Sequence, residues 1–231
     1  MPAPNFILSP CTPADVPGMV EVYLSAFEKD NFSLYCLPRA AIPAEEWDRW
    51  LTARFTKLFN SPEIRCFKIT DSNNNNRQAA FARWAFPYTP SEEKRRVKAE
   101  EEKETERLKE QGIDTRWPNG ANLEVCDLKF GPLDSCREKT INEEETFVCH
   151  LLCVHQDYWR QGLGGMLLRD VLALADDQGA QAWIEATPAG RPLYAKLGFK
   201  EVNLVKVDLS RWGGKEPGFN WGMLREASQQ I

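Results

Sequence analysis

A nearly unbroken apolar run at Phe147–Val154 leads through a glycine-rich loop into an amphipathic segment, and this succession constrains the fold more than any other feature. A run of that length and composition predicts a strand covered on both faces. The segment after the loop predicts a helix ending near Gly179, because its apolar residues recur at helical spacing: Leu163, Met166, Leu167, Val171 and Leu174. A strand predicted at 182–187 completes a βαβ unit, so two strands of the sheet run parallel.

The rest of the chain carries helix and strand patterns in a mixed order. Hydrophobic periodicity predicts helices at 13–28, 43–60 and 188–196, and strands at 6–8, 64–69, 79–86, 199–207 and 221–225. The polar run Ser72–Asn76 predicts a hairpin loop between two of these strands. Together the elements predict a single α/β (α+β) domain over residues 1–231, with helices flanking a mixed sheet.

A change of composition interrupts this pattern. Residues 91–111 hold eight Glu and seven Lys or Arg, many as opposite charges at i,i+3, which predicts a helix surrounded by water. Prolines and glycines then predict an irregular segment at 112–144. We interpret the stretch at about 88–144 as a charged helical insertion into the domain. The helix has two interpretations: a solvated face, or a lid over a substrate.

Charge and cysteine usage exclude several classes of function. The formal net charge is -5, which does not suit a general binder of nucleic-acid backbones. No apolar run is long enough to span a bilayer, and the N-terminus lacks the pattern of a secretory signal. Seven cysteines without a C-x-x-C pair and only two histidines predict reduced thiols and no metal site. We expect a cytoplasmic or nuclear monomer or homodimer with no nucleic-acid or membrane partner.

The glycine loop, Trp159–Met166, joins the buried strand to its helix and predicts an anion site. Glycines let a ligand approach the backbone, and the free N–H groups of the first helical turn attract phosphate. A dinucleotide fingerprint is a weak match, because Leu167 stands at the third glycine position, although Glu185 is in range as the acidic partner. A nucleotide-triphosphate loop needs Lys and Ser or Thr after Gly165, and neither is there. The third alternative is a loop for the pyrophosphate of coenzyme A.

Two motifs in register resemble the Gcn5-related N-acetyltransferases. The hallmark Q/R-x-x-G-x-G/A falls on Trp159-Arg160-Gln161-Gly162-Leu163-Gly164, with Trp at the first position and Arg160 and Gln161 beside it to compensate. The second hallmark, a Tyr before Leu-Gly-Phe, falls on Tyr194 and Leu197-Gly198-Phe199. The similarity covers about 147–202. It implies a mostly antiparallel twisted sheet that splays between its two parallel central strands.

The resemblance also implies an activity and a cofactor site. Acetyl-CoA would be the cosubstrate, and its acetyl group would pass directly to an amine of a small molecule or, less readily, of a peptide. The residues it assigns to coenzyme A lie on the strand end and the loop: Leu152, Cys153, Val154, Trp159, Arg160, Gln161, Gly162, Leu163, Gly164, Gly165 and Met166. The alternative function is a non-catalytic module that binds acyl-CoA.

Candidate catalytic residues follow from the same resemblance. Tyr194 would protonate the leaving thiolate, since a phenol with a pKa of about 10 can donate to it; its other interpretation is a core aromatic. The glutamate that histone-type members use as a base is replaced by Val148, which leaves His150, two residues later, as the candidate base, or a partnered strand histidine. Weaker candidates are Glu124, Glu145 and Glu185. Cys153 is interpreted as a small apolar residue rather than a nucleophile.

Aromatic residues of the N-terminal half and of the insertion are expected near the acceptor cleft. In the region that borders the cleft in this family they are Phe32, Tyr35, Trp47 and Trp50, for which core packing is the first interpretation. Tyr88 and Trp117, near the two ends of the charged helix, are expected to border the mouth of the cleft.

Overall fold

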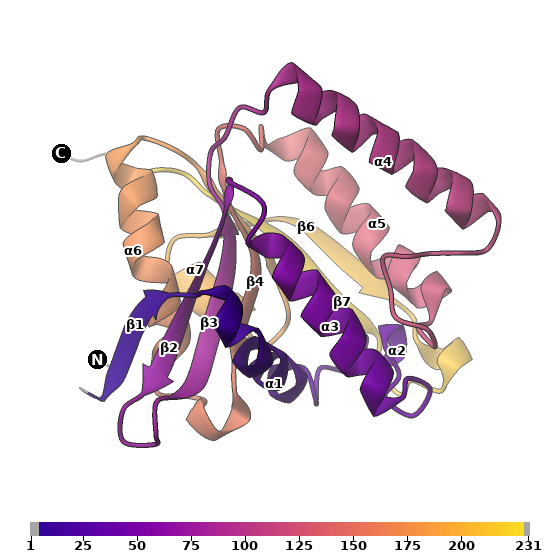
Figure 1. The fold of residues 1–231 in the computed structure, drawn as a ribbon, viewed down its shortest axis with the longest axis horizontal. Helices are drawn as coiled ribbons and strands as arrows, with labels where there is room; N and C mark the ends of the chain where they lie inside the picture. The colour runs from indigo at the N-terminus through magenta and orange to yellow at the C-terminus, as the bar shows by residue number, and fades with distance from the viewer. Residues whose placement is uncertain (1–4, 229–231) are drawn as a thin grey trace.

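The computed structural model describes residues 5–228, and one seven-stranded sheet runs through this part of the chain (Figure 1). The strand order is β1-β2-β3-β4-β5-β7-β6. The strands are β1 (Phe6–Pro10), β2 (Ile64–Asp71), β3 (Arg77–Ala85), β4 (Phe147–Val154), β5 (Ala182–Ala186), β6 (Lys200–Val207) and β7 (Gly218–Arg225). Within that order β4 and β5 are parallel and every other neighbouring pair is antiparallel. The mixed, mostly antiparallel sheet with one central parallel pair is thus confirmed.

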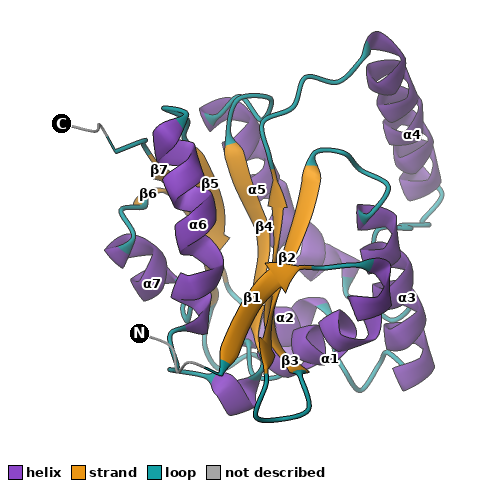
Figure 2. Ribbon diagram, turned by 60° about the vertical axis from the view of Figure 1, so that its left-hand side comes forward, coloured by secondary structure: helices purple, strands orange, loops and turns teal. Residues whose placement is uncertain are grey.

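Helices cover both faces of the sheet (Figures 1 and 2). They are α1 (Val16–Ala26), α2 (Asn31–Cys36), α3 (Ala44–Leu58), α4 (Glu92–Glu110), α5 (Leu123–Thr140), α6 (Leu163–Asp177) and α7 (Arg191–Lys196). Figure 2 shows α6 and α7 on one side of the sheet and α1 and α3 on the other. Among the described residues, no helix has the length and apolarity needed to cross a membrane.

Alternation along β3 connects the sheet to two cores, one on each face. Ala80, Ala82 and Trp84 belong to the buried cluster that includes the apolar face of α6. Phe81 lies on the opposite face, where its ring meets Phe55 of α3 with the centroids 5.5 Å apart. Alternation from Phe81 places Arg83 on that same face, where its register partner Cys66 also packs.

The charged helix is surrounded by solvent, as its sequence predicts. None of the residues of α4 is buried, and Figure 1 shows α4 farther from the sheet than α3 and α5. Within residues 5–228, three ion pairs connect it to other elements: Lys94 to Glu63, Arg95 to Glu144, and Lys109 to Asp127.

The expectation of an irregular segment at 112–144 is wrong, because α5 forms there over 18 residues in spite of Gly131 and Pro132. Asn122 caps its start by accepting a hydrogen bond from the Val125 amide at 3.3 Å. Its buried face includes Val125, Cys126 and Leu133 and packs on α2, β6 and β7. Packing of this face outweighs the hydrogen bond that the proline removes and the clash of its ring with the preceding turn.

Candidate active site

The parallel strands β4 and β5 separate soon after they begin. Their backbone pairing consists of Phe147 with Ala182, Val148 with Trp183, and Cys149 with Ile184. From His150 to the end of β4 the strand has no partner on the β5 side, while β5 continues its pairing with β7 on its other edge. The predicted splay is therefore confirmed, and it leaves backbone groups of β4 free to bind a ligand.

A β-bulge lies at the start of this splay. Arg83 pairs with Leu151 and Trp84 pairs with Cys149, so His150 is the extra residue on β4. A bulge redirects the side chains around it. Simple alternation from Val148 therefore does not describe His150, whose ring lines the cavity described next.

A cavity of about 370 Å³ crosses the sheet at the splay. Its lining includes Cys149 and Leu152, which pack on the α6 side, and Leu151, which packs on the side of α1 and α3. Its aromatic lining residues are Tyr23, Phe27, Trp50, Trp117, Phe130 and Tyr194. Its ionisable side chains, besides tyrosine and cysteine, are Arg54, Arg83, Arg116, Lys129, Asp134, Arg137, His150 and Glu185. The cavity thus gives the two faces of the sheet a common space.

His150 stands in this cavity as a neutral imidazole. Burial, together with the positive charges of Arg83, Arg137 and Arg54, holds its pKa well below the usual range. Within residues 5–228 its ring has no hydrogen-bond partner, so both ring nitrogens remain available to a ligand. The interpretation of His150 as a partnered strand residue therefore has no support in the structure.

Tyr194 reaches the same cavity from α7. Its side chain is buried at 5% exposure and packs edge-on against Phe199. Burial raises the pKa of its phenol far above the usual value, so the hydroxyl keeps its proton at any physiological pH. A Cβ at position 190 would lie 2.9 Å from the Tyr194 hydroxyl, and Gly190 therefore leaves the space this ring occupies.

The loop before α6 has the backbone conformation of an anion site. Arg160 and Gly162 both adopt positive φ, at 61° and 81°, and α6 begins at Leu163. The amides at the start of a helix have no carbonyl within the helix to bind, and here Met166 is the first whose amide does, at 3.1 Å from the Gly162 carbonyl. The 15-residue helix adds the positive end of its dipole. These groups fit a pyrophosphate.

The glycines of the helix have a second role that the sequence does not show. A Cβ at Gly164 would lie 2.8 Å from a methyl group of Leu193, so its missing side chain serves the contact between α6 and α7. A Cβ at Gly165 would lie 3.2 Å from the Arg169 guanidinium. Substituting Gly164 would therefore disturb α7, and with it Tyr194, besides the loop.

Trp159 occupies the first motif position and makes a contact of its own. Its indole N–H donates to the Val154 carbonyl at 2.8 Å, while its ring stays 45% exposed. One of the backbone groups expected to face pantetheine is thus already engaged. Of its neighbours, Gln161 donates to the Asp157 carbonyl at 3.3 Å, and Arg160 is exposed with no partner among the described residues.

Cys153, one of two cysteines on β4, is not placed for covalent chemistry. Cys153 is 1% exposed, and burial raises the pKa of its thiol well above the usual value. A thiol that keeps its proton is a poor nucleophile. The geometry therefore favours the interpretation of Cys153 as a small apolar residue of the strand.

Of the three candidate glutamates, only one lies in the cavity. Glu185 lines the cavity and accepts hydrogen bonds from Arg137 of α5 and, at 3.4 Å, from the Trp183 indole. Burial raises the pKa of its carboxyl, and the charge of Arg137 opposes that effect. The other two candidates do not line the cavity, since Glu124 pairs with Arg211 and Glu145 is exposed.

The wall of the cavity opposite the sheet differs from the one that the sequence predicts. Trp50 and Trp117 line it, but Tyr88 and all of α4 do not. The others expected near the cleft are absent from the lining as well: Phe32, Tyr35 and Trp47. The connector after α4 and the inner face of α5 complete the wall with Arg116, Lys129, Phe130, Leu133, Asp134 and Arg137. A sequence signal for this wall exists only in retrospect, as the spacing of 129, 130, 133, 134 and 137 along one helical face.

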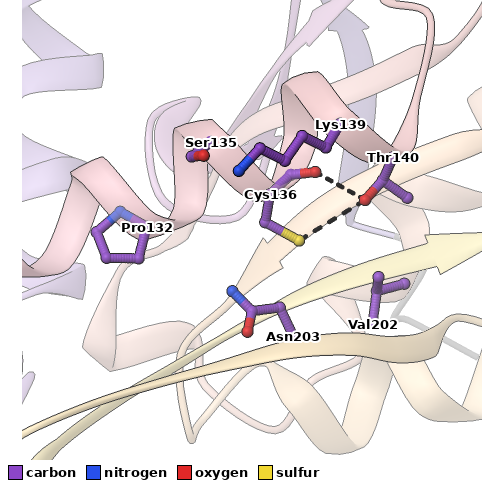
Figure 3. Close-up of a pocket in the computed structure, with 7 residues that line it drawn as sticks. All are labelled: Pro132, Ser135, Cys136, Lys139, Thr140, Val202 and Asn203. Atoms are coloured by element: carbon purple, nitrogen blue, oxygen red, sulfur yellow. Dashed lines mark hydrogen bonds between the residues drawn. The ribbon is translucent and has the colours of Figure 1, made fainter.

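A second hollow, of about 410 Å³, lies between α5 and β6 (Figure 3). Its lining consists of Pro132, Ser135, Cys136, Lys139, Thr140, Val202 and Asn203. The Cys136 thiol lies 3.7 Å from the Thr140 hydroxyl, which donates to the Cys136 carbonyl at 2.7 Å. None of the predicted site residues reaches this hollow, so the cavity at the splay is the candidate active site.

A comparison with protein families matches the part of the chain that contains the glycine loop and Tyr194. Residues 131–201 match the model of an acetyltransferase (GNAT) domain, and this segment runs from the C-terminal half of α5 through the glycine loop to the start of β6. Over these residues the chain is similar to the GNAT acetyltransferases. A comparison of the chain with curated proteins found no match.

Solved structures share the fold of this chain at low sequence identity. The C-terminal condensation domain of Ebony, in complex with beta-alanyl-dopamine, is 14% identical with a TM-score of 0.64, and the match covers 98% of this chain and 100% of that one. The ribosomal-protein-S18-alanine N-acetyltransferase of Escherichia coli is 16% identical, with a TM-score of 0.52 and coverage of 98% and 96%. The PaiA N-acetyltransferase of Thermoplasma acidophilum, in complex with coenzyme A, is 10% identical, with a TM-score of 0.52 and coverage of 96% and 98%.

Proposed function

We propose that this protein is an acetyl-CoA-dependent N-acetyltransferase that transfers acetyl directly to an amine of a small molecule. The observation that carries the proposal is the cavity at the splay. It joins the side of the sheet that carries the glycine loop to the side that carries α3 and α5, and His150 and Tyr194 both line it. A cosubstrate and an acceptor can therefore meet from opposite faces without a covalent enzyme intermediate.

Coenzyme A has a complementary surface along β4 and the loop. The amides of Leu163, Gly164 and Gly165, with the exposed Arg160, would hold the pyrophosphate. The edge of β4 at Leu152–Val154 has no strand partner on the β5 side and would hold pantetheine, apart from the Val154 carbonyl, which the Trp159 indole already binds. When bound, acetyl-CoA supplies an acetyl group activated as a thioester. The solved complex of the Thermoplasma acidophilum enzyme with coenzyme A supports the same ligand for this fold.

Tyr194 would donate the proton to the departing sulfur. Because its pKa is raised by burial, the phenol is protonated throughout the pH range of the assay. General acid catalysis by a positioned side chain contributes about 10²–10⁴-fold. On the α7 side of the splay, the other hydroxyl among the described lining residues is that of Thr187.

His150 would accept a proton from the acceptor amine. Its imidazole is neutral and unpartnered, while the Glu185 carboxylate is already bound by Arg137. The comparison of His150→Gln with Glu185→Gln decides between them. We expect the first to lower kcat by about 10²-fold or more and the second to act chiefly on stability, and a reversed ranking assigns the base to Glu185.

The enclosure of the cavity supports a small acceptor. The connector at Trp117 and the inner face of α5 close the side away from the sheet, and beta-alanyl-dopamine in the Ebony domain is a small molecule. A peptide acceptor is the alternative, since the Escherichia coli relative is named for a ribosomal protein. We place the enzyme in the cytoplasm, where seven unpaired thiols would stay reduced.

Two measurements test the function together. Isothermal titration measures the binding of acetyl-CoA, and a thiol-release assay over a panel of small amines measures transfer. We expect binding in the micromolar range with turnover of at least one class of amine. Binding without turnover across the panel supports the rival function, a non-catalytic module that binds acyl-CoA.

A further inference from the structure

The cavity holds more positive charge than its own carboxylates neutralise. Its lining carries four arginines and one lysine but only two carboxylates, Asp134 and Glu185. The protein as a whole has a formal net charge of -5, so the excess is local and not a reflection of the overall composition. Some of these cations are paired with carboxylates and others are not.

Three of the five have anionic partners. Arg116 pairs with Asp114 at 2.5 Å, and Arg137 is bound by Asp134, Glu143 and Glu185. Lys129 lies 3.9 Å from Asp30 and 3.4 Å from the Ser33 hydroxyl. These pairs account for both carboxylates of the lining. Arg54 and Arg83 remain.

Arg83 gives the stronger evidence for an anionic ligand. It lies on the central strand β3, its Nε is buried without a hydrogen-bond partner, and it has no ion pair within residues 5–228. Burial, together with the charge of Arg54, lowers the pKa of its guanidinium to about 10, which still leaves it charged at neutral pH. A buried charge without a counter-ion is costly, and an anionic ligand removes that cost.

Arg54 comes from α3 and adds a second guanidinium to the same space. Its guanidinium carbon lies 5.4 Å from the centre of the Trp50 ring, and it has no carboxylate partner among the described residues. The ring holds the planar group without neutralising it. Two unpaired guanidiniums in one cavity form a donor set that suits a carboxylate.

Coenzyme A does not supply this anion. Arg83 points to the face of the sheet that α1 and α3 cover, as Phe81 does, whereas the glycine loop begins α6 on the opposite face. We propose, on the basis of the N-acetyltransferase function above, that the acceptor carries a carboxylate as well as its amine, and that Arg83 and Arg54 bind this carboxylate. The acceptor is then an amino acid or a closely related amino carboxylate.

The remaining lining describes the body of that acceptor. Trp117 lies between Trp50 and Phe130, with ring centres 6.4 Å and 4.8 Å away, and Tyr23 lies 4.9 Å from Phe27. Aromatic walls favour an apolar or aromatic body between the carboxylate and the amine. An aromatic amino acid combines the three features.

Matched pairs of amines test the proposal. Phenylalanine, tyrosine and tryptophan are each compared with the amine that lacks only the carboxylate: phenethylamine, tyramine and tryptamine. Values of kcat/KM are referred to the concentration of neutral amine, because the carboxylate changes the amine pKa. We expect the amino acid to be favoured at least tenfold, and Arg83→Met or Arg54→Met to reduce this preference at least tenfold. Arg65→Met, an exposed arginine of β2 outside the cavity, is the matched control.

A binding experiment separates this proposal from the proposed function. Titration of 3-phenylpropionate, which has the carboxylate but no amine, into the protein saturated with coenzyme A needs no turnover. Binding that Arg83→Met weakens at least tenfold supports the anion site even if no amine is acetylated, an outcome that refutes only the transferase. Equal kcat/KM within the pairs, or no binding of 3-phenylpropionate, overturns the proposal. Preference for phosphoethanolamine over every carboxylate in the panel overturns the choice of carboxylate. Arg54→Met, on a surface helix, serves if Arg83→Met does not fold.

Discussion

Arg137 connects α5 to the active site, and its removal is the sharpest test of the structure. The guanidinium binds Glu185 of β5, Asp134 and Glu143, and the side chain is only 14% exposed. Arg137→Met leaves the Glu185 carboxylate buried without a cation. Breaking a buried pair by removing one partner costs about 3–5 kcal/mol, and we take about 3 kcal/mol because Glu185 keeps 24% exposure.

The folding stability lost in Arg137→Met depends on pH. Burial gives Glu185 a higher pKa in the folded protein than in the unfolded chain, so the folded state gains stability as the pH falls through the folded value. Without Arg137 that difference grows. Arg137→Met should therefore be more destabilised relative to the parent at pH 8 than at pH 5. Urea denaturation followed by tryptophan fluorescence measures both values.

A double-mutant cycle provides the control. In the Glu185→Gln background no buried charge is left behind, and Arg137→Met should cost less than half as much. A cost below about 1 kcal/mol in the parent, well under the range for a broken buried pair, refutes the reasoning. Equal losses at both pH values, or no rescue by Glu185→Gln, would also refute it.

Three further predictions concern activity. Tyr194→Phe keeps the ring and removes the proton donor, so kcat should fall about 10²–10⁴-fold with acetyl-CoA affinity unchanged; unchanged single-turnover rates show that the ring only packs. Arg160→Glu should weaken coenzyme A binding about tenfold, or about 1.4 kcal/mol, by titration, while Arg96→Glu on α4 should not. Replacing 91–111 with a Gly/Ser linker should leave the acceptor KM unchanged, because α4 contributes no residue to the cavity; a raised KM revives the lid hypothesis.

The parts of the fold that local pattern controls are the parts that the sequence predicts. The βαβ unit, the hairpin at Ser72–Asn76 and the solvated α4 each depend on periodicity or charge within a short window. Helix α5 was not predicted because Pro132 and the buried Lys129 break its amphipathic pattern, and its stability depends chiefly on packing against distant parts of the chain. The short α2 was not predicted either. Asp30 caps it, but a helix of six residues is too short to show hydrophobic periodicity.

The candidate site likewise has features that the local sequence predicts and features that it does not. Position in a motif located Tyr194 and the glycine loop near the splay, because both lie within one continuous segment of chain. The bulge at His150 depends on pairing with Arg83 and Trp84, which are more than sixty residues away. Whether a cation of the cavity is paired depends on where the fold places the carboxylates, and these come from distant parts of the chain. Neither feature has a signature within a local window.

The short contact between β4 and β5 has a mechanical consequence. Strands β1 to β4 form one half-sheet and β5, β7 and β6 form another, and three residue pairs are all the backbone pairing between them in the described chain. Helix α6 crosses from one half to the other in sequence, and α5 rests on the second half. A ligand lying along this seam adds the hydrogen bonds that the strands do not make to each other. If acetyl-CoA is the cosubstrate, as we propose, its binding completes the sheet at this seam and makes the two half-sheets more rigid.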